Sequence, residues 1–137
     1  MTTPQPNLSA AVLRADYERW LTFVTASRTI VRNYDRQLSQ IGKMHTDLSV
    51  LSQYLRDCMH QRSQFFGELA LILTEKVAEL RAESANEALI RRLSQAHATM
   101  QTLIEQLTNS FDELETSYRS LAGTAFFSPK RVTERVA

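Results

Sequence analysis

The side chains best suited to bind a metal or act as a nucleophile are three histidines and one cysteine. No two of His45, His60 and His97 stand three or four residues apart, the spacing that places two ligands on one helix face. Asp57 and Cys58 lie close to His60, but a site there needs further ligands or an activating base from elsewhere. We therefore expect no metal site, and we interpret Cys58 as a small residue in a helix interface.

Other catalytic motifs are also missing from the sequence. No glutamate is followed three residues later by a histidine, the arrangement with which helical bundles hold paired metal ions. The three glycines are too few and too scattered for a phosphate-binding loop. Glu79 and Glu83 share a helix face beside Lys76, which favours a solvated surface over a catalytic pocket. We expect no catalytic residues, no cofactor and no enzymatic activity.

The composition is that of one helical domain. The chain has 137 residues and 15.7 kDa, with 43% hydrophobic and 23% charged residues, close to the averages for globular domains. No proline lies between Pro6 and Pro129, so long helices are favoured. The net charge is +1 and no basic cluster is interleaved with aromatic residues, so we expect no nucleic-acid partner. The longest apolar run, residues 69–73, is far shorter than the roughly 20 residues that span a membrane.

The first predicted helix covers residues 8–41. Its apolar stripe advances in alternate steps of four and three residues, the heptad spacing that keeps one side against partner helices. The stripe comprises Leu13, Tyr17, Trp20, Val24, Ser27, Val31, Tyr34, Leu38 and Ile41. Asn7 is the predicted N-cap, and Gly42 is predicted to end the helix with a positive φ. A tight turn over residues 42–46 is favoured over a phase shift within one continuous helix.

The second predicted helix covers residues 46–82 and has a wide apolar face. Its predicted stripe comprises Leu48, Leu51, Leu55, Cys58, Arg62, Phe65, Leu69 and Ile72. Met59, Phe66 and Leu73 form a parallel stripe one position further along. An apolar face of this width predicts packing against two other helices.

The third predicted helix covers residues 85–122 and has the most regular heptads. They comprise Ile90, His97, Ile104, Phe111 and Tyr118 at one position and Leu93, Met100, Leu107, Leu114 and Leu121 at the other. Ser84 and Glu87 match a capping box, which favours a turn before this helix over an unbroken helix through residues 82–85. Gly123 is predicted to end it.

These helices predict an all-α fold, an elongated antiparallel three-helix bundle of coiled-coil type. We expect a lead over residues 1–7, the helical domain over 8–122 and a tail over 123–137. A rival architecture is a long helical hairpin whose core is completed by helices from other chains, and both remain open at this point.

Three polar residues interrupt the apolar stripes, namely Ser27, Arg62 and His97. If the first turn centres near residues 44 and 45, antiparallel pairing places Ser27 opposite Arg62, where polar residues fix register and partner choice. Alternatively, Arg62 extends to the edge of the bundle and keeps its guanidinium in water. His97 is expected to be hydrogen-bonded at a helix interface.

Two features point outward from the predicted bundle. Val50 and Leu71 lie away from the stripe, either as scattered surface residues or as the centre of a docking surface for a partner. In the tail, Phe126 and Phe127 form either a short docking segment or a cover over the end of the bundle. Ser128, in the run Ser-Pro-Lys-Arg, is a candidate phosphorylation site.

Taken together, these patterns predict a non-enzymatic interaction protein. We expect a small adaptor or structural subunit of a larger assembly, cytoskeletal, trafficking or similar, whose partners are other helical proteins or a second copy of the chain. The alternative is a small export or assembly chaperone that holds an amphipathic client helix. Binding to a membrane surface is disfavoured because no basic amphipathic face is present. A single cysteine fits a reducing compartment, so we expect a cytoplasmic location.

Overall fold

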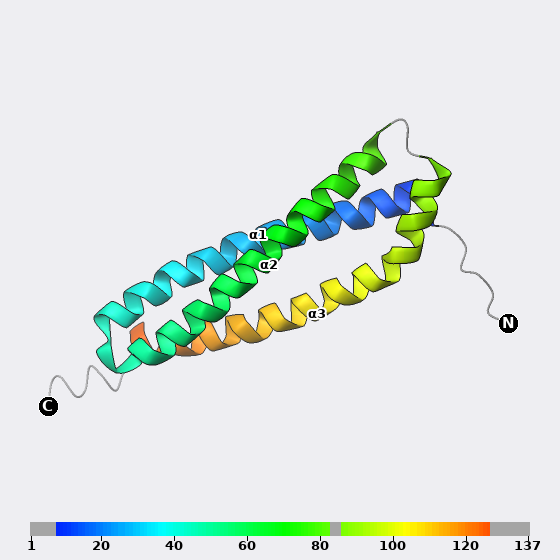
Figure 1. Cartoon of the computed structure of the whole chain (residues 1–137). Helices are drawn as coiled ribbons and strands as arrows, with labels where there is room; N and C mark the ends of the chain where they lie inside the picture. The colour runs from blue at the N-terminus through cyan, green and yellow to red at the C-terminus, as the bar shows by residue number, and fades with distance from the viewer. Residues whose placement is uncertain (1–7, 83–85, 127–137) are drawn as a thin grey trace, which may run out of the picture. The chain divides into compact units, whose positions relative to one another are not determined.

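A computed structural model describes residues 8–82 and 86–126, and the regular elements in these residues are all helices (Figure 1). They are α1 (Ala10–Met44), the short 3₁₀ helix η1 (Thr46–Leu48), α2 (Ser49–Arg81) and α3 (Glu87–Phe126). Three long helices with no strand in the described residues confirm the predicted all-α helical bundle. The separation of α1 from α2 confirms a turn between them in place of one continuous helix.

The chain divides into two compact units, and each unit takes one segment from every long helix. Among the described residues, unit 1 contains those up to Ser27 together with those between Phe66 and Asn109, and unit 2 contains Arg28–Phe65 together with those from Ser110 to Phe126. Three segments of one chain therefore supply each core, as the three-helix prediction requires.

Contacts within each unit show that α1 runs antiparallel to α2. In unit 1, Glu18 contacts Arg81 near the end of α2, whereas Phe23, further along α1, contacts Phe66, earlier in α2. In unit 2, the turn residues between the two helices place the end of α1 beside the start of α2. The up-and-down course of the first two helices is thus present in each unit.

Side-chain hydrogen bonds between α1 and α3 share one sequence offset. Hydrogen-bonded side chains from the two helices lie 81 residues apart in both units. The pairs are Asp16–His97 in unit 1, and Tyr34–Glu115 and Gln37–Tyr118 in unit 2. In unit 2 the two pairs advance together along both helices, so α1 and α3 run parallel there.

The predicted apolar stripe of α1 is confirmed. Its residues are at most 4% exposed, apart from the half-buried Tyr34. The buried members are Leu13, Tyr17, Trp20, Val24, Ser27, Val31, Leu38 and Ile41. The N-cap is Ser9, whose Oγ accepts from the Val12 N–H at 3.1 Å. The predicted cap, Asn7, lies outside the described residues.

The predicted stripe of α2 is right at Leu55 and Leu69, which are each 4% exposed, and wrong at Leu51, Phe65 and Ile72, which are 48%, 40% and 48% exposed. The predicted parallel stripe of Met59, Phe66 and Leu73 is buried. The buried stripe comprises Ser52, Leu55, Met59, Phe66, Leu69, Leu73, Val77 and Leu80. Both stripes are apolar, so periodicity alone does not decide which of them faces α1 and α3.

Neither Gly42 nor Gly123 ends a helix as predicted, since no glycine in the described residues has a positive φ. Gly42 lies within α1, where an added Cβ would stand 3.3 Å from Ser52 Oγ, so the missing side chain allows α2 to approach closely. Gly123 lies within α3, which continues to Phe126 and buries Ala125 on the same apolar face. Burial of Ala125 thus favours further helical turns over a cap at Gly123.

The predicted heptads of α3 are largely confirmed. The buried members are Leu93, Ile104, Leu107, Phe111, Tyr118 and Leu121, while Ile90, His97, Met100 and Leu114 are half-buried. The helix starts at Glu87, and Asn86 Oδ1 accepts from the Leu89 N–H at 2.9 Å. Asn86 is therefore the N-cap. The predicted cap, Ser84, lies outside the described residues.

Candidate functional site

A histidine, an aspartate and a tryptophan join α1 to α3 in unit 1. His97 Nε2 lies 2.7 Å from Asp16 Oδ2, and the His97 ring packs against Trp20 with centroids 5.1 Å apart. Arg19 also contacts the carboxylate, with Nη2 3.0 Å from Asp16 Oδ1. The His97 and Asp16 side chains are only 15% and 18% exposed. His97 is thus hydrogen-bonded at a helix interface, while its role in setting register stays a prediction.

Two stacked tyrosines join α1 to α3 in unit 2. The rings of Tyr34 and Tyr118 lie 4.0 Å apart and 18° from parallel. Tyr34 Oη donates to Glu115 Oε2 at 2.7 Å, and Tyr118 Oη donates to Gln37 Oε1. Burial raises the pKa of both tyrosines above 10.0, and for Tyr34 the hydrogen bond to Glu115 raises the pKa further. Both hydroxyls therefore remain protonated donors that hold the interface.

Ser27 and Arg62, the other two residues predicted to fix the register of the helices, differ in their surroundings. Ser27 is buried in unit 1, at 3% exposure. Arg62 is half-buried in unit 2, and its Nε is buried with no hydrogen-bond partner among the described residues. Because the two residues belong to different units, their pairing stays a prediction.

The side chains with metal-binding or nucleophilic chemistry are dispersed. Cys58 is a half-buried free thiol, and His60 Nε2 lies 3.2 Å from Asp35 Oδ1. Within residues 8–82 and 86–126, no three histidine, cysteine, aspartate or glutamate side chains gather as a metal site requires. The proximity of Asp57, Cys58 and His60 in sequence therefore does not become a ligand cluster in the described structure.

A groove of about 240 Å³ lies between α2 and α3 in unit 2, here termed the α2–α3 groove. Its walls include Tyr54, Cys58 and Arg62 from α2 and Glu113, Leu114 and Ser117 from α3. Tyr54 is 63% exposed, and Leu51 and Phe65 lie on the same face of α2. The groove is thus bordered by apolar side chains that this unit leaves uncovered.

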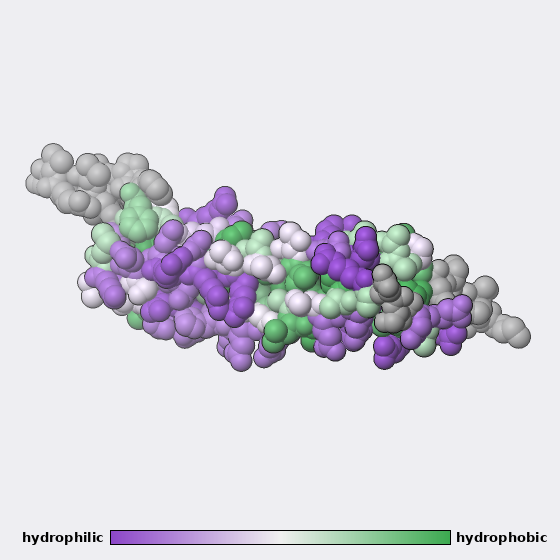
Figure 2. All heavy atoms as spheres, turned by 90° about the horizontal axis from the view of Figure 1, so that it is seen from above, coloured by the Kyte–Doolittle hydropathy of each residue, from purple (hydrophilic) through white to green (hydrophobic). Residues whose placement is uncertain are grey.

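The residues predicted to face outward are exposed where the structure describes them. Val50 in unit 2 is 83% exposed and Leu71 in unit 1 is 75% exposed. Phe126 is 45% exposed, and its ring centroid lies 6.2 Å from that of His45 at the end of α1. Phe127 and Ser128 lie outside the described residues. Figure 2 shows one face of the molecule, on which apolar side chains reach the surface among hydrophilic ones.

Sequence reasoning missed the exposed side of α2. It assigned Leu51 and Phe65 to the core and gave no role to Tyr54. The signal available was the second apolar stripe of α2, because a helix that buries one stripe leaves residues of the other on its surface.

Comparison with known proteins does not add a function. No family model matches the chain, and no curated protein or solved structure matches it. In the described part of the chain, every helix is too short or too polar to cross a lipid bilayer.

Proposed function

We propose that the chain is a non-enzymatic helical interaction protein, a small adaptor or structural subunit of a larger assembly. The observation that supports this proposal is the exposure of Leu51, Tyr54 and Phe65 on one face of α2 beside the α2–α3 groove. An amphipathic helix laid in such a groove buries apolar side chains from both proteins, and this burial is the main source of affinity in helix-in-groove recognition.

The partner that fits the α2–α3 groove is an amphipathic helix with apolar residues on one side and a carboxylate near Arg62. Arg62 Nε is buried and has no hydrogen-bond partner in the described part of the chain, and a buried guanidinium gains most from a carboxylate acceptor. Glu113, on the opposite wall, favours a basic residue at the other edge of the partner helix. Opposite charges at the two walls would orient the bound helix as well as hold it.

A site-specific photocrosslinker tests this proposal in the full-length protein inside cells. A crosslinking residue in place of Gln61, in the wall of the groove, is expected to capture a helical protein. The same residue in place of Gln95, an exposed glutamine of α3 in unit 1, is the matched control. Leu51→Glu with Phe65→Glu should abolish the capture at position 61 while leaving the helical circular dichroism unchanged. Capture at position 95 alone would contradict the proposal, and a product of twice the chain's mass would identify a second copy as the partner.

An export or assembly chaperone is the second candidate function. The exposed groove on α2 favours it, because a chaperone must present a free surface to an amphipathic client helix. The two functions differ in the lifetime of the complex. A chaperone releases its client, so the crosslinked product should disappear during a chase, whereas an adaptor remains bound in the mature assembly.

We also propose a cytoplasmic location. The support is the single cysteine, Cys58, which is a free thiol and fits a reducing compartment. Fractionation of cells that express the tagged full-length chain tests this directly. Recovery in a secreted or periplasmic fraction would contradict it.

A further inference from the structure

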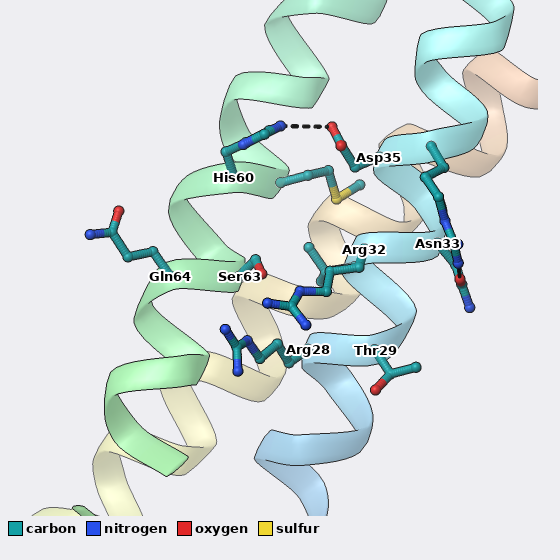
Figure 3. Close-up of a pocket in the computed structure, with 11 residues that line it drawn as sticks. Arg28, Thr29, Arg32, Asn33, Asp35, His60, Ser63 and Gln64 are labelled. Atoms are coloured by element: carbon teal, nitrogen blue, oxygen red, sulfur yellow. Dashed lines mark hydrogen bonds and ion pairs between the residues drawn. The ribbon is translucent and has the colours of Figure 1, made fainter. Parts of the chain in front are cut away.

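A second and larger cleft, of about 720 Å³, lies between α1 and α2 in unit 2, here termed the arginine cleft (Figure 3). Arg28, Arg32 and Arg36 line it from α1, and His60 and Ser63 line it from α2. The three arginines follow one another at four-residue steps, so they lie along one face of α1. Positive charge is therefore concentrated on one wall of the cleft.

The acidic groups of the cleft do not neutralise this charge. Asp35 is the carboxylate that lines the cleft, and its Oδ1 already lies 3.1 Å from Arg56 Nε and 3.2 Å from His60 Nε2. Among the described residues, no ion pair joins a carboxylate to Arg28 or Arg32. The arginine cleft therefore carries an excess of positive charge that its own residues leave uncompensated.

Two features of these arginines are unfavourable in the free protein. Arg28 is half-buried, and its Nε is buried with no hydrogen-bond partner among the described residues. A buried charged donor that lacks an acceptor costs folding free energy, and like charges four residues apart on a helix repel each other. An anion held between Arg28 and Arg32 would remove both penalties.

The side-chain directions suit such an anion. In Figure 3, Arg28 and Arg32 both extend from α1 toward α2 on the side of Ser63, whereas Gln64 points away. Guanidinium groups present planar pairs of donors that match the oxygens of a phosphate, and the Ser63 hydroxyl lies on the facing wall as a further donor.

The residues that line the arginine cleft also limit the class of ligand that it can bind. Among the described residues that line the arginine cleft, none is phenylalanine, tyrosine or tryptophan, so a nucleic-acid base would find no stacking platform. The apolar lining residues Val31 and Met59 are each only 1% exposed and offer little surface. Recognition must then come from charge and hydrogen bonding to the anionic group itself.

We propose that the arginine cleft is a binding site for a phosphate group, held between the guanidinium groups of Arg28 and Arg32. The phosphate belongs either to a small phosphorylated molecule or to a phosphorylated peptide. This site lies between α1 and α2, whereas the groove of the proposed function lies between α2 and α3, so each can fail without the other.

Isothermal titration calorimetry on the full-length protein tests the site with two probes, inorganic pyrophosphate and a short phosphoserine peptide, against the unphosphorylated peptide. We expect a saturating single-site isotherm for at least one phosphorylated probe and none for the unphosphorylated peptide. Stronger binding of pyrophosphate assigns the site to small molecules, and stronger binding of the phosphopeptide assigns it to modified proteins. The absence of binding by both phosphorylated probes overturns the proposal.

Paired variants separate the arginine cleft from general positive charge. Arg28→Gln with Arg32→Gln removes two charge-assisted contacts, each worth about tenfold or more in affinity, so the Kd should rise about a hundredfold. Arg91→Gln with Arg92→Gln removes the same charge from exposed positions of α3 in unit 1 and should leave the Kd within about twofold at physiological salt. Equal weakening by the two double variants overturns the proposal.

A single substitution tests the site even if the double variant does not fold. Arg32 is exposed, so Arg32→Gln should keep the wild-type melting curve and still weaken phosphate binding about tenfold. Arg32→Lys keeps the charge but loses the planar fork, and should give an intermediate Kd. Wild-type affinity in Arg32→Gln would show that Arg32 does not touch the ligand and would overturn the proposed geometry.

Discussion

Two adjacent phenylalanines on α2 provide a sharp test of which side of this helix forms the core. Phe66 is 0% exposed and Phe65 is 40% exposed. The Phe66 ring also meets Phe23 edge to face, with centroids 6.3 Å apart and planes at 85°. Phe66→Ala therefore removes a fully buried ring and leaves a cavity, a change that costs about 3–5 kcal/mol.

Phe65→Ala is the matched control for this substitution. It deletes the same atoms from the same helix and brings the same change in helix propensity. Complete burial of a phenylalanine stabilises a fold by about 1.5–3 kcal/mol, so a ring that is 40% exposed should contribute about 1–2 kcal/mol, with no enclosed cavity left behind. The expected difference between the two variants is thus about 2–3 kcal/mol.

Urea denaturation followed by circular dichroism measures both losses, and thermal melting provides a second readout. For a chain of this length, 1 kcal/mol corresponds to about 3 °C in Tm, so Phe66→Ala should lower the Tm by about 10–15 °C and Phe65→Ala by about 3–6 °C. Equal losses, or a larger loss for Phe65→Ala, would refute the burial argument. Such a result would indicate that the stripe through Phe65, and not the stripe through Phe66, faces the core.

Three further measurements test other parts of the fold. Because burial raises the pKa of Tyr34 and Tyr118 above 10.0, the stability that depends on their protonated hydroxyls is complete below pH 10 and falls as the pH rises through the raised values. Urea midpoints up to about pH 11 should show this fall, and a fall of the same size in Tyr34→Phe would contradict it. Asn86→Ala should lower the free energy of unfolding by about 1 kcal/mol, with most of it kept in a serine variant, whereas no loss would exclude a capping role. His97→Ala should cost about 2 kcal/mol, and in a double-mutant cycle with Asp16→Ala the two losses should be less than additive; full additivity would argue against the 2.7 Å contact.

The success of the α1 prediction and the errors at Leu51, Phe65 and Ile72 in the α2 prediction have one physical cause. In α1 the apolar residues follow a single line, so only one side of the helix can face the core. In α2 two neighbouring lines are apolar, and the buried line is the one that contacts α1, with Ser52 beside Gly42 and Phe66 beside Phe23. Local pattern does not contain that choice, because it depends on where the other helices lie.

The arginine cleft could not be found by the sequence reasoning for a similar reason. In the sequence, Arg28 and Arg32 have the pattern of a solvated helix face, and no aromatic residue lies between them as in a nucleic-acid-binding cluster. The cleft exists only because α2 supplies His60 and Ser63 as a second wall. The useful signal was the series of arginines at four-residue steps with one carboxylate, Asp35, beside it.

The shared offset of 81 residues between the two hydrogen-bonded pairs of α1 and α3 in unit 2 limits which insertions and deletions this unit can accept. One residue added to α1 between Tyr34 and Gln37 rotates the rest of that helix by about 100°, which separates Gln37 from Tyr118. An added residue at the matching place in α3 would restore the pairing. An insertion or deletion in one of these two helices should therefore be accompanied by a change of the same length in the other.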